Sequence, residues 1–213
     1  MKHKVNKKLK DNHPQEKYFL INFKPHSYLK ATISKPTTSV MFIQKPHPQD
    51  YPNFYATYID FIDGDVIKEL ENQNTNFYRF IKNLPAEKEE YRYAEGKWSA
   101  KEVIGHVLEV ERIMTYRALA ISRADQQSLP GMDENNYIVN SNYSNQRVDD
   151  LAEEFLHLRK ANIYLFKSFS QEMLSRKGIA NGNPITVAAL VYIIAGHLAH
   201  HTQVLNERYL AAV

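Results

Sequence analysis

Four segments of the chain, each about twenty residues long, carry apolar side chains at the spacing of an amphipathic helix. They run from about residue 65 to 84, 99 to 124, 148 to 168 and 186 to 210. No convincing strand pattern follows residue 62. Because each helix must bury its apolar face against a neighbour, the pattern predicts an all-α fold, a four-helix bundle with an irregular N-terminal extension.

The second segment has the clearest start. Ser99-Ala100-Lys101-Glu102 has the pattern of a capping box. In this motif the Ser99 hydroxyl and the Glu102 carboxylate each accept a hydrogen bond from an otherwise unpaired backbone amide. We therefore expect the second helix to begin here.

Proline- and glycine-containing stretches separate the predicted helices. They are Pro85, Pro130-Gly131 and Asn181-Gly182-Asn183-Pro184. Residues 41–63 are rich in Pro and Tyr, which excludes a long helix there. We expect an extended run followed by a short helical turn over residues 53–61, with its aromatic side chains packed on the domain.

The first forty residues differ in composition from the rest. They hold nine lysines against Asp11 and Glu16, a charge of +7; the whole chain carries +3, which leaves −4 for residues 41–213. Residues 1–40 are therefore interpreted as a disordered basic extension, or as sequence upstream of a mis-annotated start at Met41, with the bundle domain in residues 41–213. The alternative is a basic arm for nucleic acid or anionic lipid. Nucleic-acid binding is not expected of the mildly acidic main body.

The chain contains no cysteine. Disulfides and thiolate ligands are thus excluded, and His, Asp and Glu remain as metal ligands. No run of eighteen apolar residues is present, so no transmembrane helix is predicted. These features favour a cytoplasmic protein without a membrane partner.

Three histidines lie in apolar stretches of two predicted helices. His197 and His201 are four residues apart, so they project from one face of the last helix, one turn apart. His106 has a similar setting in the second helix. Three neutral imidazoles that converge from two packed helices make a site for a divalent metal, with room for water or substrate. Alternatively, each is a core histidine bonded to a carbonyl or carboxylate, and the spacing alone does not decide between the two.

Two charged residues near His106 are candidates for supporting roles, since no catalytic group beyond metal-bound water or thiol is evident. Glu109 lies one turn from His106 and could orient an imidazole N–H, or pair with Arg112 at the surface. Arg117 lies three turns along the same face. It could hold an anionic group of a substrate, or form a structural ion pair with Asp or Glu.

Other polar residues are given lesser roles. His200 lies about 100° from His201 around the helix and is not expected to be a ligand. His157 has no helical partner and is interpreted as structural or exposed. The long connection after the second helix carries Asp133, Glu134 and Tyr137, which could cover the site.

These motifs resemble the DinB-like/YfiT superfamily, whose members are metal-dependent four-helix bundles. The segment Gly96-Lys97-Trp98-Ser99-Ala100-Lys101-Glu102-Val103-Ile104-Gly105-His106-Val107-Leu108-Glu109 resembles its second-helix signature, and Ala195-Gly196-His197-Leu198-Ala199-His200-His201 resembles its final-helix motif. Residues 129–135 and 180–182 look like loops of one branch of the superfamily. The resemblance covers about residues 46 to 210, and the first forty residues have no counterpart.

The resemblance implies that His106, His197 and His201 bind one divalent ion, zinc or nickel, with open coordination positions. Activities associated with the superfamily include transfer of low-molecular-weight thiols such as bacillithiol or mycothiol, isomerisation of maleylpyruvate with mycothiol, and metal-dependent hydrolysis. The resemblance therefore implies a hydrolase or thiol S-transferase that acts on a small molecule. The alternative is a non-catalytic, stress-associated bundle that binds a metal or small ligand. Similar bundles often dimerise, so a homodimer stays open.

Overall fold

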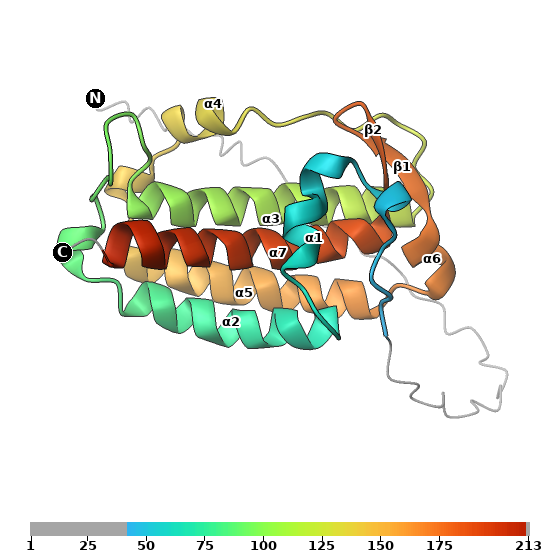
Figure 1. Cartoon of the computed structure of the whole chain (residues 1–213), viewed down its shortest axis with the longest axis horizontal. Coiled ribbons are helices and arrows are strands. Elements are labelled where there is room, and N and C mark those ends of the chain that lie inside the picture. Colours follow the sequence, from blue (N-terminus) through green and yellow to red (C-terminus); the bar gives the residue numbers. More distant parts are fainter. Residues whose placement is uncertain (1–41, 212–213) are drawn as a thin grey trace, which may run out of the picture. The chain divides into compact units, whose positions relative to one another are not determined.

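Four long helices dominate the computed structural model, which describes residues 42–211 (Figure 1). They are α2 (Val66–Lys82), α3 (Ala100–Ser122), α5 (Val148–Lys167) and α7 (Val187–Val204). Each lies within a segment that the apolar periodicity marks as helical. The predicted all-α bundle of four helices is therefore confirmed.

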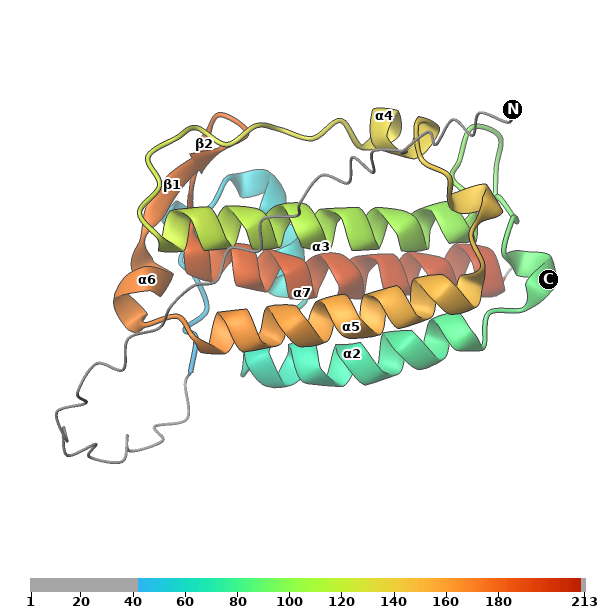
Figure 2. The same ribbon diagram turned by 180° about the vertical axis from the view of Figure 1, so that it is seen from behind.

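The long helices form two neighbouring pairs. Helix α2 packs along α5, and α3 packs along α7 (Figures 1 and 2). The short helix α1 (Ala56–Asp60) crosses α7, and α4 (Glu134–Val139) lies over α3. The remaining short elements are α6 (Gln171–Ser175) and 3-10 turns at Pro48–Asp50, Asn53–Tyr55, Ala86–Lys88 and Tyr143–Asn145.

A β-hairpin precedes α7. Strands β1 (Lys177–Ala180) and β2 (Asn183–Thr186) pair antiparallel. The expectation that no strand follows residue 62 is therefore wrong. Asn181 and Gly182 both have positive φ, 51° and 72°, as the two central residues of a type I′ hairpin turn require. An Asn-Gly pair is a strong signal for that turn, and it was interpreted only as a break in the chain.

The hairpin also holds the connection that follows α3. The backbone amide of Leu129 donates to the carbonyl of Ile179 at 2.9 Å, and the amide of Asn181 donates to the carbonyl of Leu129 at 3.0 Å. These bonds tie Leu129 to the hairpin at Ile179 and Asn181.

The helix ends agree with the sequence signals at α3 but not at α7. At α3, Ser99 Oγ accepts from the amide of Glu102 at 3.2 Å, and Glu102 Oε2 accepts from the amide of Ser99 at 2.7 Å, so the capping box is confirmed. The last helix was expected to be continuous to about residue 210. Instead α7 ends at Val204 and the chain continues as a π-helix, Leu205–Leu210.

A buried polar network joins the four long helices. Arg159 is fully buried and forms a double hydrogen bond with Glu111, with two N–O distances of 2.7 Å. Its third bond is to Gln73 Oε1 at 2.9 Å, and Gln73 Nε2 donates to the carbonyl of Ala195 at 2.9 Å. A buried ion pair is tolerated only when its remaining polar atoms are bonded in this way.

The expectations for residues 1–40 and for a start at Met41 lie outside the described residues. Within residues 42–211, no helix is long and apolar enough to cross a membrane.

Candidate metal centre

The three histidines of the predicted metal site meet in the interior of the bundle. His106 comes from α3, and His197 and His201 come from α7. One ring nitrogen of each lies within 4.8 Å of the others, and Nε2 of His106 is 3.0 Å from Nε2 of His197. Only 2% of His106 and 5% of His197 is exposed. The structure thus brings all three predicted ligands together.

Burial keeps these imidazoles neutral. It lowers the pKa of His106 to about 4 and that of His201 to about 3. The pKa of His197 is also well below its ordinary value, chiefly because of burial and then because of the neighbouring His201 and His106. At neutral pH each ring therefore keeps a lone pair that can bind a cation.

The geometry suits one divalent ion. A tetrahedral zinc with bonds of about 2.0–2.1 Å holds its nitrogen ligands roughly 3.3 Å apart, close to the separation of His106 and His197. The remaining distances, up to 4.8 Å, require only small side-chain adjustments. In addition, Nδ1 of His106 and Nδ1 of His201 are buried without a hydrogen-bond partner. The residues present therefore fit a metal.

A glycine precedes a metal-ligand candidate in both helices. At Gly196, an added Cβ would overlap the carbonyl oxygen of Tyr58, so the backbone of α1 lies directly on α7. At Gly105, a Cβ would overlap the ring of Tyr143. The ring of Tyr58 meets His197 edge-on, with centroids 5.4 Å apart. These two tyrosines were not expected at the site; the glycine before each histidine is the sequence signal that indicates close covering segments.

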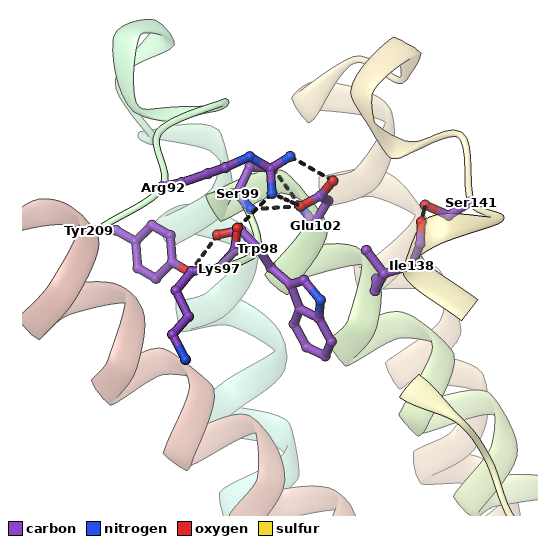
Figure 3. A network of polar contacts seen from close by, with 8 residues as sticks. All are labelled: Arg92, Lys97, Trp98, Ser99, Glu102, Ile138, Ser141 and Tyr209. Atoms are coloured by element: carbon purple, nitrogen blue, oxygen red, sulfur yellow. Dashed lines mark hydrogen bonds and ion pairs between the residues drawn. The ribbon is translucent and has the colours of Figure 1, made fainter. Parts of the chain in front are cut away.

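Trp98 covers the site from the start of α3. Its indole lies 4.8 Å from the His106 ring, centroid to centroid. The carbonyl of Trp98 accepts from the Tyr209 hydroxyl at 2.8 Å, and Arg92 holds Glu102 of the capping box at 2.6 and 2.9 Å. Figure 3 shows this network, with the indole pointing away from Arg92. The hydrogen bonds around the N-terminal cap of α3 therefore help to hold Trp98, whose indole packs against His106.

Two cavities reach the histidines from different directions. The first has a volume of about 190 Å³, and its lining includes His197, Tyr58 and Arg117. The second, of about 320 Å³, includes His201 and Trp98. A small molecule in either cavity can approach the cluster.

Glu109 lies near the cluster and is bonded elsewhere. Its Oε1 accepts from the Tyr143 hydroxyl at 3.0 Å, and its Oε2 is buried without a partner. Burial raises the pKa of its carboxyl group. No hydrogen bond between Glu109 and a histidine occurs within residues 42–211, and Arg112 forms its ion pair with Glu154.

Arg117 is 4% exposed and lies in the first cavity. Asp133 caps α4, where it accepts from the amide of Asn136 at 3.0 Å. Glu134 lines the first cavity, whereas Tyr137 is 44% exposed. The predicted covering loop therefore contributes one of its three named side chains to a cavity wall.

The two histidines that were not expected to be ligands do not belong to the cluster of three. His200 packs against the ring of His201, with centroids 5.0 Å apart, and lines the second cavity. The side chain of His157 is 76% exposed and lies 3.9 Å from Glu153.

Sequence comparison connects this arrangement with known proteins. A family model described as the DinB superfamily matches residues 69–205. No curated protein matches the chain.

Three solved structures align with the chain, and two of them do so with a TM-score above 0.5. YfiT from Bacillus subtilis, described as a probable metal-dependent hydrolase with an unusual four-helix bundle topology, is 13% identical with a TM-score of 0.59, over 76% of this chain and 92% of YfiT. A mycothiol-dependent maleylpyruvate isomerase is 13% identical with a TM-score of 0.53, over 64% of this chain and 58% of the isomerase. A DinB-like protein from B. subtilis, YjoA, is 17% identical with a TM-score of 0.48, over 66% of this chain and 86% of YjoA. At such identities the likeness concerns the fold.

Proposed function

This chain belongs to the DinB superfamily, and we propose that it is a divalent-metal-dependent enzyme that transfers a thiol to a small molecule or hydrolyses one. His106, His197 and His201 hold the ion in this proposal. The observation that carries it is the meeting of three buried imidazoles whose ring nitrogens lie within 4.8 Å of one another.

The alternative of three core histidines fits the contacts less well. Such histidines are expected to bond to a carbonyl or carboxylate, because an unpaired buried polar atom costs about 1–3 kcal/mol. Within the described residues, the hydrogen-bond partner of His106 is His197, and Nδ1 of both His106 and His201 has none. A cation between the facing nitrogens, such as Nε2 of His106 and Nε2 of His197, would bind lone pairs for which the described residues offer no carbonyl or carboxylate.

The protein supplies a neutral and largely enclosed set of ligands. A bound divalent ion lowers the pKa of a coordinated water or thiol toward neutrality, which makes it a nucleophile at pH 7. The three imidazoles bring no negative charge, so they leave the charge of the ion available for that effect. Tyr58 and Trp98 pack on His197 and His106 and limit the access of solvent.

The choice of metal and nucleophile follows from the ligands and the fold. Imidazole nitrogens suit zinc and nickel. One protein of similar fold is described as a probable metal-dependent hydrolase and another as a mycothiol-dependent isomerase. These descriptions support water and a low-molecular-weight thiol as the two candidate nucleophiles.

Metal analysis followed by cobalt substitution tests the proposal. We expect one divalent ion per chain in the purified protein, and a thiolate-to-cobalt absorption band when a small thiol is added to the Co²⁺-loaded protein. Absence of metal, together with no uptake of zinc, nickel or cobalt, would overturn the proposal. Metal that is held firmly but accepts no thiol, and no hydrolytic or transfer activity in a screen of esters and electrophiles, would favour the non-catalytic alternative.

A further inference from the structure

The cavity beside His197 is lined by a buried guanidinium, that of Arg117, which forms no ion pair with a carboxylate of residues 42–211. Arg117 is 4% exposed, and its Nη2 donates to the carbonyl of Pro130 at 2.7 Å while its Nη1 contacts Met114 Sδ at 3.4 Å. Both acceptors are uncharged. None of the ion pairs found in residues 42–211 includes Arg117.

Arg159, which is also buried, has a different environment. It is held by both oxygens of Glu111. A buried charge is destabilising unless it is paired. Arg117 forms no ion pair with a described residue, so we expect its guanidinium to bind an anionic ligand.

The position of Arg117 relates this charge to the metal centre. Arg117 follows His106 by eleven residues on α3, which is about three turns or roughly 16 Å between Cα atoms. Long side chains on a helix lean toward its N-terminus, and the contact with Met114 one turn back shows that Arg117 does so. Arg117 and His197 line the same cavity of about 190 Å³. A ligand in this cavity can therefore reach the guanidinium at one end and the histidine cluster at the other.

Other titratable groups line the cavity beside Arg117, namely Glu134, Tyr55 and Tyr58. Glu134 lines the cavity but forms no ion pair with Arg117 within the described residues. Its charge also acts on Tyr55 and Tyr58, whose pKa values are raised mainly by burial and in part by this carboxylate. Arg117 lowers the pKa of Tyr55 by its charge and by a hydrogen bond, which offsets part of this rise. A protonated phenol thus stands beside the guanidinium and can donate to the same anion.

We propose that this cavity binds the substrate and that Arg117 holds a carboxylate of the substrate, several bonds away from the group that reacts at the three histidines. The reacting end rests on the proposed function, whereas the carboxylate end does not. A planar guanidinium matches a carboxylate with two parallel hydrogen bonds, and the contacts with Pro130, Met114 and Tyr55 leave two of its five N–H donors. A phosphate dianion would leave one negative charge unbalanced next to Glu134, so a carboxylate fits better.

The test compares two thiols that differ only in charge. The Co²⁺-loaded protein is titrated with 6-mercaptohexanoate and with neutral 6-mercapto-1-hexanol, and the thiolate-to-cobalt band reports binding. We expect the carboxylate to bind at least about tenfold more tightly. Arg117→Gln should abolish this difference. Arg79→Gln, which removes the same charge from an exposed position on α2, should leave it intact.

A shorter pair of thiols tests the separation of the two ends. With 3-mercaptopropionate and 3-mercapto-1-propanol, we expect a smaller difference because the short chain cannot span the cavity. Equal affinities of the long carboxylate and the long alcohol, or a difference that survives Arg117→Gln, would overturn the inference.

Two further measurements keep the inference testable if Arg117→Gln does not fold or if cobalt does not bind. Glu134 is exposed, so Glu134→Gln is expected to fold; it removes a repelling charge and should tighten 6-mercaptohexanoate at least about threefold without affecting the alcohol. Unchanged or weaker binding would contradict the inference.

If cobalt does not bind, the proposed function fails, and the inference is tested alone by calorimetry of hexanoate with the metal-free protein. Binding to the wild type that is lost in Arg117→Gln would support the inference. Absence of binding to the wild type would overturn it.

Discussion

The carbonyl oxygen of Tyr58 lies directly against Gly196, at a place where any larger residue would project its Cβ into that oxygen. The neighbouring residue on α7 is His197, and the ring of Tyr58 packs on it edge-on. The close backbone contact at Gly196 therefore determines how tightly α1 covers a metal-ligand candidate.

Gly196→Ala should destabilise the protein. Alanine normally favours a helix by about 1 kcal/mol over glycine, but here it collides with backbone, which cannot rotate away. We expect a melting temperature several degrees below that of the wild type. Gly105→Ala is the comparison, since its Cβ meets the ring of Tyr143, a side chain that can move; it should cost less. An unchanged or higher melting temperature for Gly196→Ala would show that α1 does not hold this position.

His201→Ala should lower the affinity for zinc at least about tenfold, because one of three imidazole ligands is removed. The helical circular dichroism should survive, since the apolar core of the bundle is independent of this side chain. Competition with a chromogenic chelator measures the affinity. The matched control is His157→Ala, whose exposed ring lies apart from the cluster. Unaltered zinc affinity in His201→Ala would refute the ligand assignment.

The metal-free protein should lose stability in mild acid. His106 has an ordinary pKa of 6.5, and burial lowers it to about 4 in the folded state. Between these values the unfolded chain binds more protons, so the free energy of unfolding falls as pH falls through this window. From pH 7 to pH 5 we expect His106 to contribute a loss on the order of 2 kcal/mol.

Urea unfolding at the two pH values measures this loss. His106→Gln should show a shallower pH dependence than the wild type, while His157→Gln should keep the wild-type dependence. A steep dependence retained in His106→Gln would assign the effect to other groups.

Glu111→Gln should be strongly destabilising because it leaves the fully buried guanidinium of Arg159 without a counter-charge. Breaking a buried pair in this way costs about 3–5 kcal/mol. Glu154→Gln breaks the partly exposed pair with Arg112 and should cost less than about 1 kcal/mol. Denaturant unfolding compares them.

The double change Glu111→Met with Arg159→Met serves as the control for fold integrity. Removing both charges replaces the pair by apolar contacts and should recover much of the stability. Equal losses for Glu111→Gln and Glu154→Gln would contradict the assignment.

The four long helices could be predicted because their apolar periodicity and the capping box at Ser99 are local signals that the packing then reinforces. The hairpin could not be found from alternation, since Gly178 and Pro184 interrupt two strands of only four residues each. The Asn181-Gly182 turn was its one local signal. The π-helical end of α7 has the same apolar residues as a continued α-helix would have, so periodicity does not distinguish them.

The histidine cluster followed from residue type and spacing, since a helix of known phase shows which side chains share a face. The neighbours of the cluster depend on tertiary contacts. Tyr143 reaches Glu109 from a 3-10 turn more than thirty residues later in the chain. Whether an acidic residue would fold against Arg117 could not be decided from the sequence, because the chain offers 24 of them.

The amide group of Gln73 touches Arg159 with its oxygen and the carbonyl of Ala195 with its nitrogen. Helices α2 and α5 supply no histidine to the cluster, yet this side chain joins both of them to the backbone of α7 two residues before His197. In Gln73→Asn the amide is one carbon shorter and cannot make both contacts at these distances, so the link between α2, α5 and α7 beside the cluster is lost.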